Sequence, residues 1–594
     1  MKSSVHTLIY AFLAFGGLSV LADAIPPGGE RLEFARPFEE WTAAGSSEAT
    51  MTVRPRLTSG QPFDNALSIQ VHERVASEYG QQLAGQIKGQ ILKGDVLLLS
   101  FYARCDQSDD ESGLGHFAVT GRAMHGSRYL FPFTRICMPD RAWKQYLIPF
   151  SAPIDNTRGY RITFKFGGVK PQTVKLGGLE VRNYGKAVTM EELPRTEAYY
   201  SGMEADASWR MAAAERIEKH RKADLVFRVV DEGGNPVPNA TVHAELKRHS
   251  YGFGAAVGLN QMFSQNDPVL AKQYQTVVRE LFNKAVFENR MKWKFYRDGD
   301  EQLERAMDWF AENDIPLRGH CMVWPAWKRL PQRMQAYQDS PEEFRTVIEQ
   351  HVRKMATVYP DSFVEWDIVN ELYSQHEFVD LYGRDVVVDW FRIAREANPK
   401  FTTYINDYAI LAGHDLEHQN NYHEWISYLL KEKAPVEGIG FQGHFRAPVP
   451  PEEIYERLER FAEFGLEMQI TEFDFEETDE ELQARFARDF MIIVFSHPQT
   501  VGIMTWCLWE KSAYKPSAAF FTADWRKKPI AETWEQLIKD EWHTDATVKT
   551  DAEGRAQIRG FLGDYRITVN GKRLSNEGLY RLNGESGVFE ITLK

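Results

Sequence analysis

Between residues 251 and 541, short apolar runs alternate with amphipathic stretches, and this rhythm restricts the fold more than any other feature of the chain. Eight runs have the length of a strand: "YGFGAAVG", "KAVFEN", "PLRGHCMVW", "VEWDIVNE", "FTTYINDY", "GIGFQGHF", "LEMQITEFDF" and "VGIMTWCLW". Helix-like stretches such as "DEQLERAMDWFAEND" lie between them. Eight strand–helix units over this length predict a (β/α)8 TIM barrel. An open doubly wound sheet is the alternative, but no glycine-rich phosphate loop follows the first run.

The flanks of this segment have a different pattern. Residues 25–186 alternate polar and apolar positions with Gly, Pro and Asp between runs, which is typical of a β-sandwich. Residues 187–222 are rich in Ala, Glu, Arg and Lys, and predict a helical linker. Two small β-rich pieces, 223–250 and 542–594, are too short to hold a core alone. We therefore expect them to pack together or to dock on the barrel.

The first 24 residues have the features of a secretory signal peptide. A lysine at position 2 precedes an apolar core, and small residues frame a cleavage site before Ile25. The alternative is an N-terminal membrane anchor, but the apolar core is shorter than the ~20 residues that a bilayer span requires. This segment predicts a secreted protein, either extracellular or retained in the periplasm or cell envelope.

Charge and cysteine content exclude several other classes of function. The net charge of −14 argues against a nucleic-acid partner, since phosphate contact requires a basic face. The four cysteines, Cys105, Cys137, Cys321 and Cys507, show no metal-ligand spacing. Cys105 and Cys137 fall in the same β-rich region and are candidates for a disulfide; buried thiols are the alternative.

Polar and aromatic side chains follow seven of the eight apolar runs. In a barrel of this type the carboxyl ends of all strands meet at one face, so these residues should line one cleft. They are Glu288, Asn289, Lys292, His320, Trp324, Asn370, Glu371, Asn406, Asp407, Gln442, His444, Glu472, Asp474, Trp506 and Trp509. Glu371 and Glu472 end the fourth and seventh runs, on opposing sides of the mouth. Glycoside hydrolysis requires such a pair, one carboxyl to protonate the leaving oxygen and one to attack or to activate water.

The segments "FENRMKW", "RGHCMVW", "WDIVNE", "YINDY", "GIGFQGHF" and "ITEFD" resemble, in order and spacing, the signature segments of glycoside hydrolase family 10, the retaining endo-β-1,4-xylanases. The resemblance covers residues 251–541. It implies that Glu371 is the general acid/base and Glu472 the nucleophile, ionised and held by His444. We expect the pKa of Glu371 to be raised by its neighbour's charge and by partial burial.

The resemblance also implies the residues that hold the sugar. Asn370 would bond the 2-hydroxyl at the cleavage site, and Asn406 would lie near the acid/base side, with Asp474 as a second supporting residue. The remaining polar grip and the aromatic walls would come from Glu288, Asn289, Lys292, His320, Gln442, Trp324 and Trp506. Core packing is the alternative for the tryptophans, including Trp509. No metal or organic cofactor is implied.

Two positions depart from the commonest family pattern. Pro325 stands beside Trp324 where a histidine is usual, and Tyr514 stands where many members have a second tryptophan. Neither change removes a carboxylate, so we expect effects on subsite preference and rate.

The sandwich is similar to the carbohydrate-binding jelly rolls that accompany such enzymes. Trp143, Tyr146 and Phe150 would be either a sugar platform or core. Together these features predict a monomeric enzyme that cleaves internal β-1,4-bonds of xylan. The alternatives are the same fold acting on another β-glycan or on aryl β-glycosides, and a polysaccharide-binding protein without catalysis.

Overall fold

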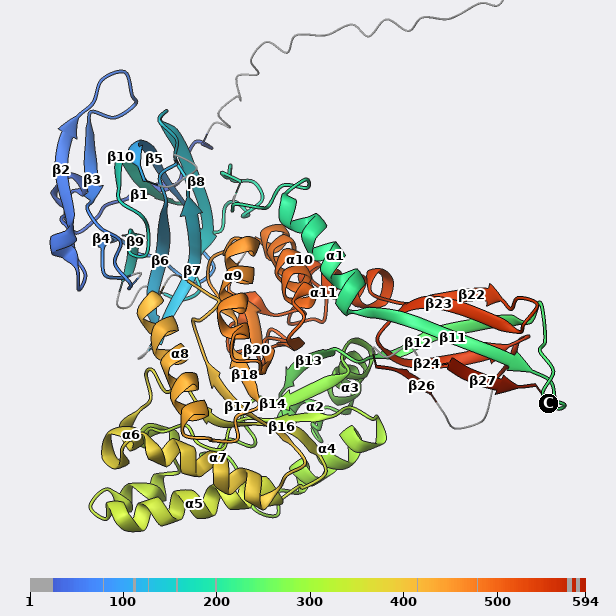
Figure 1. The fold of residues 1–594 in the computed structure, drawn as a ribbon. Coiled ribbons are helices and arrows are strands. Elements are labelled where there is room, and N and C mark those ends of the chain that lie inside the picture. Colours follow the sequence, from blue (N-terminus) through green and yellow to red (C-terminus); the bar gives the residue numbers. More distant parts are fainter. Residues whose placement is uncertain are drawn as a thin grey trace, which may run out of the picture.

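The computed structural model describes residues 25–593, with the exception of 78, 110–113, 126–127, 156–158, 198–199, 414, 478, 574–578 and 584–587. Figure 1 shows three parts: an N-terminal pair of β-sheets, a central barrel surrounded by helices, and a group of strands beside the barrel. The predicted signal peptide lies outside the described residues.

The N-terminal part is built from two antiparallel sheets. Strand order is β2-β3-β10-β5-β8 in the first, with β1 beside β10, and β4-β9-β6-β7 in the second. The strands are β1 (Glu30–Leu32), β2 (Met51–Leu57), β3 (Asn65–Val71), β4 (Gln82–Gln86), β5 (Val96–Ser108), β6 (Phe117–His125), β7 (Arg128–Cys137), β8 (Lys144–Ser151), β9 (Tyr160–Lys165) and β10 (Gln172–Asn183). Alternate residues of these strands face a shared apolar core, which explains the period-two pattern. We call this part the sandwich.

The proposed aromatic platform of the sandwich lies mostly within this core. Tyr146 and Phe150 are buried, and Tyr146 stacks on Phe101. Trp143 is half-buried and packs edge-on against Phe63. Tyr146 and Phe150 are therefore core residues, which is the alternative predicted for them, whereas the half-buried Trp143 does not belong to this core.

The linker contains one helix, shorter than the sequence suggested. Helix α1 spans Ser208–His220, and strand β11 begins at Lys222. The described residues between 187 and 207 form turns and irregular chain. Pro194 disfavours helix at the residue before it, and Gly202 has a φ of +82°, so composition alone overstated the helix here.

The central part is an eight-stranded parallel barrel, and each predicted run corresponds to one strand of the ring. The strands are β13 (Gly252–Val257), β14 (Lys284–Phe287), β15 (Leu317–Gly319), β16 (Phe363–Asn370), β17 (Thr402–Asp407), β18 (Gly438–Phe441), β20 (Glu467–Phe475) and β21 (Thr500–Thr505). β13 pairs with both β14 and β21, which closes the ring. A two-residue strand, β19 (His444–Phe445), adds to β20 at the mouth. The predicted barrel is confirmed.

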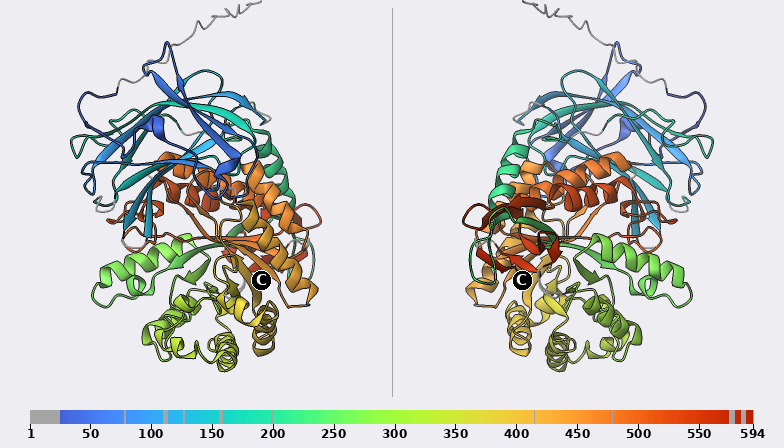
Figure 2. Two further views of the ribbon diagram at one scale, coloured as in Figure 1. Left: turned by 90° about the vertical axis from the view of Figure 1, so that its left-hand side faces the viewer. Right: turned by 90° about the vertical axis from the view of Figure 1, so that its right-hand side faces the viewer.

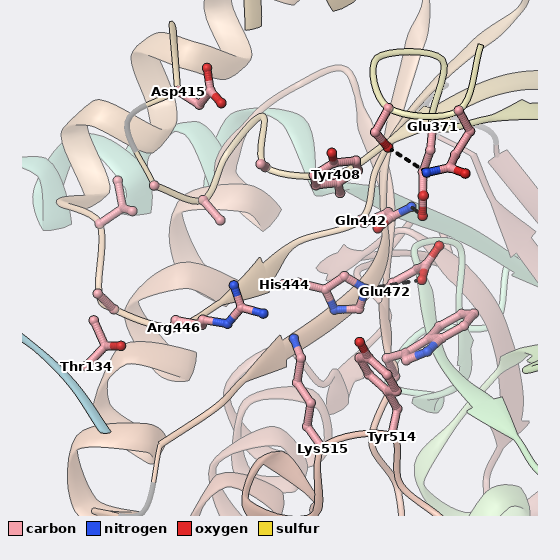
Figure 3. Close-up of a pocket in the computed structure, with 18 of the residues that line it drawn as sticks. Thr134, Glu371, Tyr408, Asp415, Gln442, His444, Arg446, Glu472, Tyr514 and Lys515 are labelled. Carbon is pink, nitrogen blue, oxygen red and sulfur yellow. Dashed lines mark hydrogen bonds and ion pairs between the residues drawn. The ribbon is translucent and has the colours of Figure 1, made fainter. Parts of the chain in front are cut away.

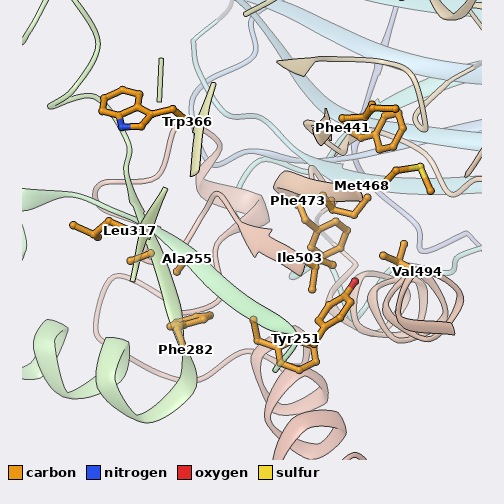
Figure 4. Close-up of a cluster of buried hydrophobic side chains, with 14 of the residues drawn as sticks. Tyr251, Ala255, Phe282, Leu317, Trp366, Phe441, Met468, Phe473, Val494 and Ile503 are labelled. Carbon is orange, nitrogen blue, oxygen red and sulfur yellow. The ribbon is translucent and has the colours of Figure 1, made fainter. Parts of the chain in front are cut away.

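Helices follow the strands and cover the outside of the barrel. They are α2 (Leu259–Met262), α3 (Pro268–Leu281), α4 (Glu301–Glu312), α5 (Pro341–Thr357), α6 (Glu377–Tyr382), α7 (Asp385–Ala397), α8 (Leu416–Lys431), α9 (Pro451–Ala462), α10 (Glu480–Ser496) and α11 (Pro529–Gln536). Aspartate side chains accept backbone N–H groups at the starts of α3, α4, α8 and α10. Proline stands in the first turn of α3, α5, α9 and α11, where its missing N–H costs nothing. Most apolar side chains of the helices and strands form one core, part of which Figure 4 shows, while Ala256, Val286 and Met504 belong to a separate small cluster.

The two small β-rich pieces flank the barrel segment in the sequence and pair with each other in the structure. β11 (Lys222–Val230) lies antiparallel to β23 (Arg555–Phe561) and parallel to β27 (Val588–Thr592). β12 (Thr241–His249) lies between β22 (Asp545–Lys549) and β24 (Gly563–Val569). The short strands β25 (Lys572–Arg573) and β26 (Tyr580–Leu582) extend the second sheet from β24. Pairing gives each piece the core that neither could build alone.

The four cysteines are free and buried. Cys105 lies in β5 and Cys137 in β7, and both thiols are free, so the suggested disulfide between them is absent and the alternative of buried thiols holds. Across the described parts of the chain, no helix combines the length and the apolar character that a membrane crossing needs.

The sandwich packs beside the orange helices of the barrel, as both views in Figure 2 show, and it contributes residues to the cleft at the mouth of the barrel. Arg135 of β7 forms an ion pair with Glu477, which lies just after β20, and the carboxylate of Glu477 is fully buried. Arg446 places its guanidinium 4.2 Å from the ring centre of Phe131. A buried ion pair that loses one partner leaves an uncompensated charge, so these contacts hold the two parts in one arrangement.

Candidate active site

Glu371 stands at the point where β16 ends and the chain turns. Its φ is +59°, a left-handed conformation that few residues other than glycine adopt. Its backbone N–H donates to the carbonyl of Asn406 at the end of the neighbouring strand, at 3.0 Å. The turn directs the Glu371 side chain into the mouth of the barrel, and backbone strain of this kind is concentrated at functional sites.

Two hydrogen bonds hold the Glu371 carboxyl group. Nε1 of Trp324 donates to Oε2 at 3.1 Å, and Nε2 of Gln442 donates to Oε1, also at 3.1 Å. Burial raises the pKa of Glu371, and the charges of Asp407 and Glu472 raise it further, while the Gln442 bond opposes them. The raised pKa was expected, but burial contributes more than the charge of the second glutamate. A raised pKa keeps the carboxyl group protonated at a higher pH than an ordinary glutamate, as the role of proton donor requires.

Glu472 lies in β20 and is buried on the floor of the same cleft (Figure 3). Burial by itself would raise its pKa, but His320, His444 and Lys292 outweigh burial and lower the pKa to about 2. Nε2 of His444 lies 3.3 Å from Oε2, and Nδ2 of Asn406 donates to Oε1 at 3.1 Å. There is therefore a pH range in which Glu472 is ionised while Glu371 is still protonated.

A second buried carboxylate supports His444 from behind. Oδ2 of Asp474 lies 2.7 Å from Nδ1 of His444, and Nζ of Lys515 donates to Oδ1 of Asp474 at 2.8 Å. Burial lowers the pKa of His444, but Asp474 outweighs it, and the net pKa is raised. The row Lys515–Asp474–His444–Glu472 thus alternates positive and negative groups and stabilises the charge on Glu472.

Asn406 connects the two strand ends that carry Asn370 and Glu472. Its Nδ2 donates to Oδ1 of Asn370 at 3.0 Å as well as to Glu472, and its Oδ1 accepts from Thr471 at 2.8 Å. A Cβ at position 440 would lie 2.4 Å from this Oδ1, so Gly440 leaves room for the amide. The side chain of Asn406 therefore contacts the predicted nucleophile, and its backbone carbonyl accepts from the N–H of the predicted acid/base, Glu371.

Asn370 is buried and keeps one hydrogen-bonding group unused. Its Oδ1 accepts from Asn406 and, at 3.4 Å, from Gln442. Its Nδ2 is buried and has no hydrogen-bond partner among the residues that the structure describes. A buried donor without a partner costs free energy, and a ligand oxygen beside the two glutamates would remove that cost.

The other predicted binding residues also reach the cleft. Its lining includes Glu288, Asn289, Lys292, His320, Trp324, Gln442, His444 and Trp506. The ammonium of Lys292 donates to Asn289 at 3.1 Å and lies 5.3 Å from the ring centre of Trp324. Burial raises the pKa of Glu288. Asn370, Asn406 and Asp474 lie beneath this lining and orient it.

Two predicted residues lie elsewhere. Trp509 stacks on Trp525 with ring centres 5.1 Å apart and belongs to the core, which is the alternative considered for it. Asp407 is buried, with Oδ1 3.0 Å from Nε2 of His418, and acts on Glu371 only through its charge. Of the two departures, Tyr514 is 54% exposed and lines the cleft, whereas Pro325 is buried behind it.

Sequence reasoning missed three contributions to the site. Lys515 is separated from Asp474 along the chain, and nothing in the pattern around it indicates that the two meet. Asp367 accepts from Nδ1 of His320 at 2.8 Å and orients that ring, but it reads as an ordinary position within a strand. The third is a wall of the cleft that the sandwich supplies. It was missed because contact between two domains leaves no local pattern in the sequence.

A sequence model of glycosyl hydrolase family 10 matches residues 242–536. This part of the chain is a family 10 domain. The match extends over the whole barrel except for the helical turn that precedes the C-terminal strands. The eight strands and every residue of the site described above lie within this family 10 domain, apart from the wall supplied by the sandwich.

Named relatives fall into more than one class. The chain is 30% identical over 398 residues to the anti-sigma-I factor RsgI6 of Acetivibrio thermocellus, covering 65% of this chain and 50% of that protein. It is 28% identical over 348 residues to endo-1,4-beta-xylanase B of Thermotoga neapolitana, covering 53% of this chain and 97% of that protein. The crystal structure of native xylanase 10B from Thermotoga maritima aligns at 28% identity with a TM-score of 0.43, over 49% of this chain and 97% of that one. The chain thus spans half the length of the first of these relatives.

Proposed function

We propose that the chain is a retaining endo-acting glycoside hydrolase that cleaves internal β-1,4-xylosidic bonds of xylan. One observation carries this proposal: two carboxyl groups share a cleft, with the pKa of Glu371 raised and that of Glu472 lowered to about 2. Because the two pKa values are shifted in opposite directions, Glu371 suits the role of proton donor and Glu472 that of nucleophile. Membership of residues 242–536 in family 10 and the xylanase names of several relatives support the same reaction and substrate.

The reaction would proceed in two displacements. In the first, Glu472 attacks the anomeric carbon while Glu371 gives its proton to the leaving glycosidic oxygen, which breaks the bond and forms a glycosyl ester on Glu472. In the second, Glu371, now ionised, takes a proton from water, and the water oxygen attacks the same carbon and releases Glu472. Each displacement inverts the anomeric carbon, so the product keeps the β configuration.

The unused Nδ2 of Asn370 would donate to the 2-hydroxyl of the sugar at the cleavage site. Glu288, Asn289, Lys292 and His320 would hold this sugar and its non-reducing neighbour, between the indoles of Trp324 and Trp506. A contact with the 2-hydroxyl that strengthens in the transition state adds to the rate and not only to binding.

Product analysis tests the substrate and the mechanism together. The full chain is incubated with xylan, arabinoxylan, β-glucan and cellulose, and the products are identified. New reducing ends from xylan alone, a rapid fall in viscosity and initial release of β-anomers are expected. Products only from another polymer would place the enzyme on a different β-glycan, and initial release of α-anomers would contradict the retaining mechanism.

A second candidate is a polysaccharide-binding protein without turnover. The name of the anti-sigma relative favours it, because that relative is named as a regulator and not as an enzyme. Binding of xylan without any product in the same panel would support this candidate. We also propose that residues 1–24 direct secretion; N-terminal sequencing of the exported protein should begin at Ile25.

A further inference from the structure

The cleft that holds both glutamates continues beyond the barrel onto the sandwich. Its volume is about 1190 Å³, above the roughly 300–1,000 Å³ typical of small-molecule sites. The sandwich contributes Tyr79, His116, Thr134, Ile136, Lys165 and Val169 to its lining. A site for one or two sugars does not need a wall from a second domain, so this extension calls for a ligand that reaches it.

The sandwich wall lies across the mouth from the predicted grip on the non-reducing sugars. That grip follows β14 and β15. The barrel residues that contact the sandwich follow β17, β18 and β20, and in the ring β18 lies opposite β14 and β20 lies opposite β15. The N–H of Leu416, the first residue of α8, donates to the carbonyl of Ala76 at 3.3 Å and joins the start of this helix to the sandwich. Figure 3 shows Thr134, Asp415 and Arg446 on one side of the cleft, away from Glu371 and Glu472.

A chain held by its non-reducing sugars at β14 and β15 therefore extends toward the sandwich on its reducing side. This is the part that leaves when the bond breaks. The direction rests on the proposed function, because it takes the sugar-binding roles from that proposal.

Tyr79 is the exposed aromatic residue of this wall. Its side chain is 37% exposed, and Nζ of Lys165 lies 4.9 Å from its ring centre. Lys165 itself is buried in β9, so a fixed strand supports the tyrosine. A tyrosine combines an apolar ring with a hydroxyl group, so it suits a surface that is partly apolar and partly exposed to solvent.

We propose that Tyr79, supported by Lys165, forms a binding platform on the sandwich for the reducing-side sugars of the polysaccharide that the barrel cleaves. The sandwich thereby acts as part of the substrate cleft and not as a separate anchor. Its docking supports this role: the buried pair of Arg135 and Glu477 keeps the platform in a fixed position relative to the catalytic glutamates.

Substrates of different length test the proposal in the full chain. Tyr79→Ala should lower kcat/KM for xylan and for long xylo-oligosaccharides by about three- to tenfold, mainly through KM. Hydrolysis of an aryl β-xylobioside should be unchanged, because its small leaving group does not reach the sandwich. Tyr79→Trp should keep the platform and restore most of the loss. An equal loss on both kinds of substrate, or no loss on the long ones, would overturn the proposal.

Tyr129→Ala is the matched control. Tyr129 is also an exposed tyrosine of the sandwich with a cation over its ring, since Cζ of Arg122 lies 4.5 Å from its centre. It does not belong to the cleft lining that the structure describes. This variant should keep wild-type kinetics on every substrate; a loss equal to that of Tyr79→Ala would show a general effect of the sandwich surface and contradict the platform.

A binding measurement separates this proposal from the proposed activity. Calorimetric titration of the Glu472→Gln variant with long xylo-oligosaccharides, with and without Tyr79→Ala, needs no turnover. Weaker binding in the double variant supports the platform even if the wild type cleaves nothing. Unchanged binding contradicts the platform even if the wild type is an active xylanase.

Discussion

His444 and Glu472 lie 3.3 Å apart, from Nε2 to Oε2, and the other ring nitrogen of His444 faces Asp474 at 2.7 Å. The imidazole is thus placed between two buried carboxylates, and its raised pKa favours the positive form there. This arrangement keeps Glu472 ionised despite burial. It also makes the ionisation of Glu472 depend on Asp474, which lies behind His444 and does not face the substrate.

Replacing Glu472 with Gln should abolish turnover of every glycoside, by more than about a thousandfold in kcat. The amide has nearly the same shape but cannot form the glycosyl ester. Steady-state rates on xylan and on an aryl β-xyloside measure the loss. Activity within about tenfold of the wild type would rule out Glu472 as the nucleophile.

Replacing Glu371 with Ala should separate substrates by their leaving group. Removal of a general acid costs about 10²- to 10⁴-fold for xylan, whose leaving oxygen needs a proton. An activated aryl glycoside does not need that proton in its first displacement, so its burst of released phenol should persist. Similar losses in the first step for both substrates would contradict the acid role.

The pH profile should be broad and should respond to Asp407. Activity requires Glu472 ionised and Glu371 protonated, so the acidic limb of kcat/KM reports a pKa near 2 and the basic limb a pKa above the ordinary 4.5. The charge of Asp407 helps to raise the pKa of Glu371. Asp407→Asn should therefore move the basic limb to lower pH and leave the acidic limb in place. A shift toward higher pH would contradict the assignment of the basic limb to Glu371.

Replacing Arg135 with Leu should destabilise the protein by up to about 3–5 kcal/mol, because it removes a cation that pairs with the buried carboxylate of Glu477. Denaturant unfolding followed by tryptophan fluorescence measures the change. Adding Glu477→Gln should recover part of it.

Arg228→Leu provides the comparison for that variant. Arg228 pairs with Glu590 at 2.9 Å, but both side chains are exposed, at 43% and 58%. An exposed pair contributes about 0–1 kcal/mol, so this variant should unfold close to the wild type. Equal losses for Arg135→Leu and Arg228→Leu would show that burial of the first pair has no energetic consequence.

The barrel could be predicted because its signal is local and repeated. Each strand is an apolar run bounded by polar residues, and one rule places the ends of all the strands on one face. Glu371, Glu472 and most of the binding residues followed from that rule. The linker helix was overestimated because composition counts helix-forming residues but does not register Pro194 and Gly202 as interruptions.

Contacts between distant segments could not be predicted in the same way. Lys515 meets Asp474 only after β20 and β21 are aligned, and Tyr79 reaches the cleft only after the sandwich docks. The partner of β11 was left open because strand patterns indicate which face is buried but not which strand lies alongside. These features depend on tertiary packing, to which a single sequence gives no local clue.

The pairing of β11 and β12 with strands from the last 50 residues has a consequence for the order of folding. During synthesis both strands emerge before the barrel, yet Leu225 meets Ile558 only after more than three hundred further residues have been made. Until then their edges offer unpaired N–H and C=O groups to any neighbouring chain. A chain cut after the barrel would keep all its catalytic residues and still be prone to aggregation. It would lack the C-terminal strands that pair with the edges of β11 and β12.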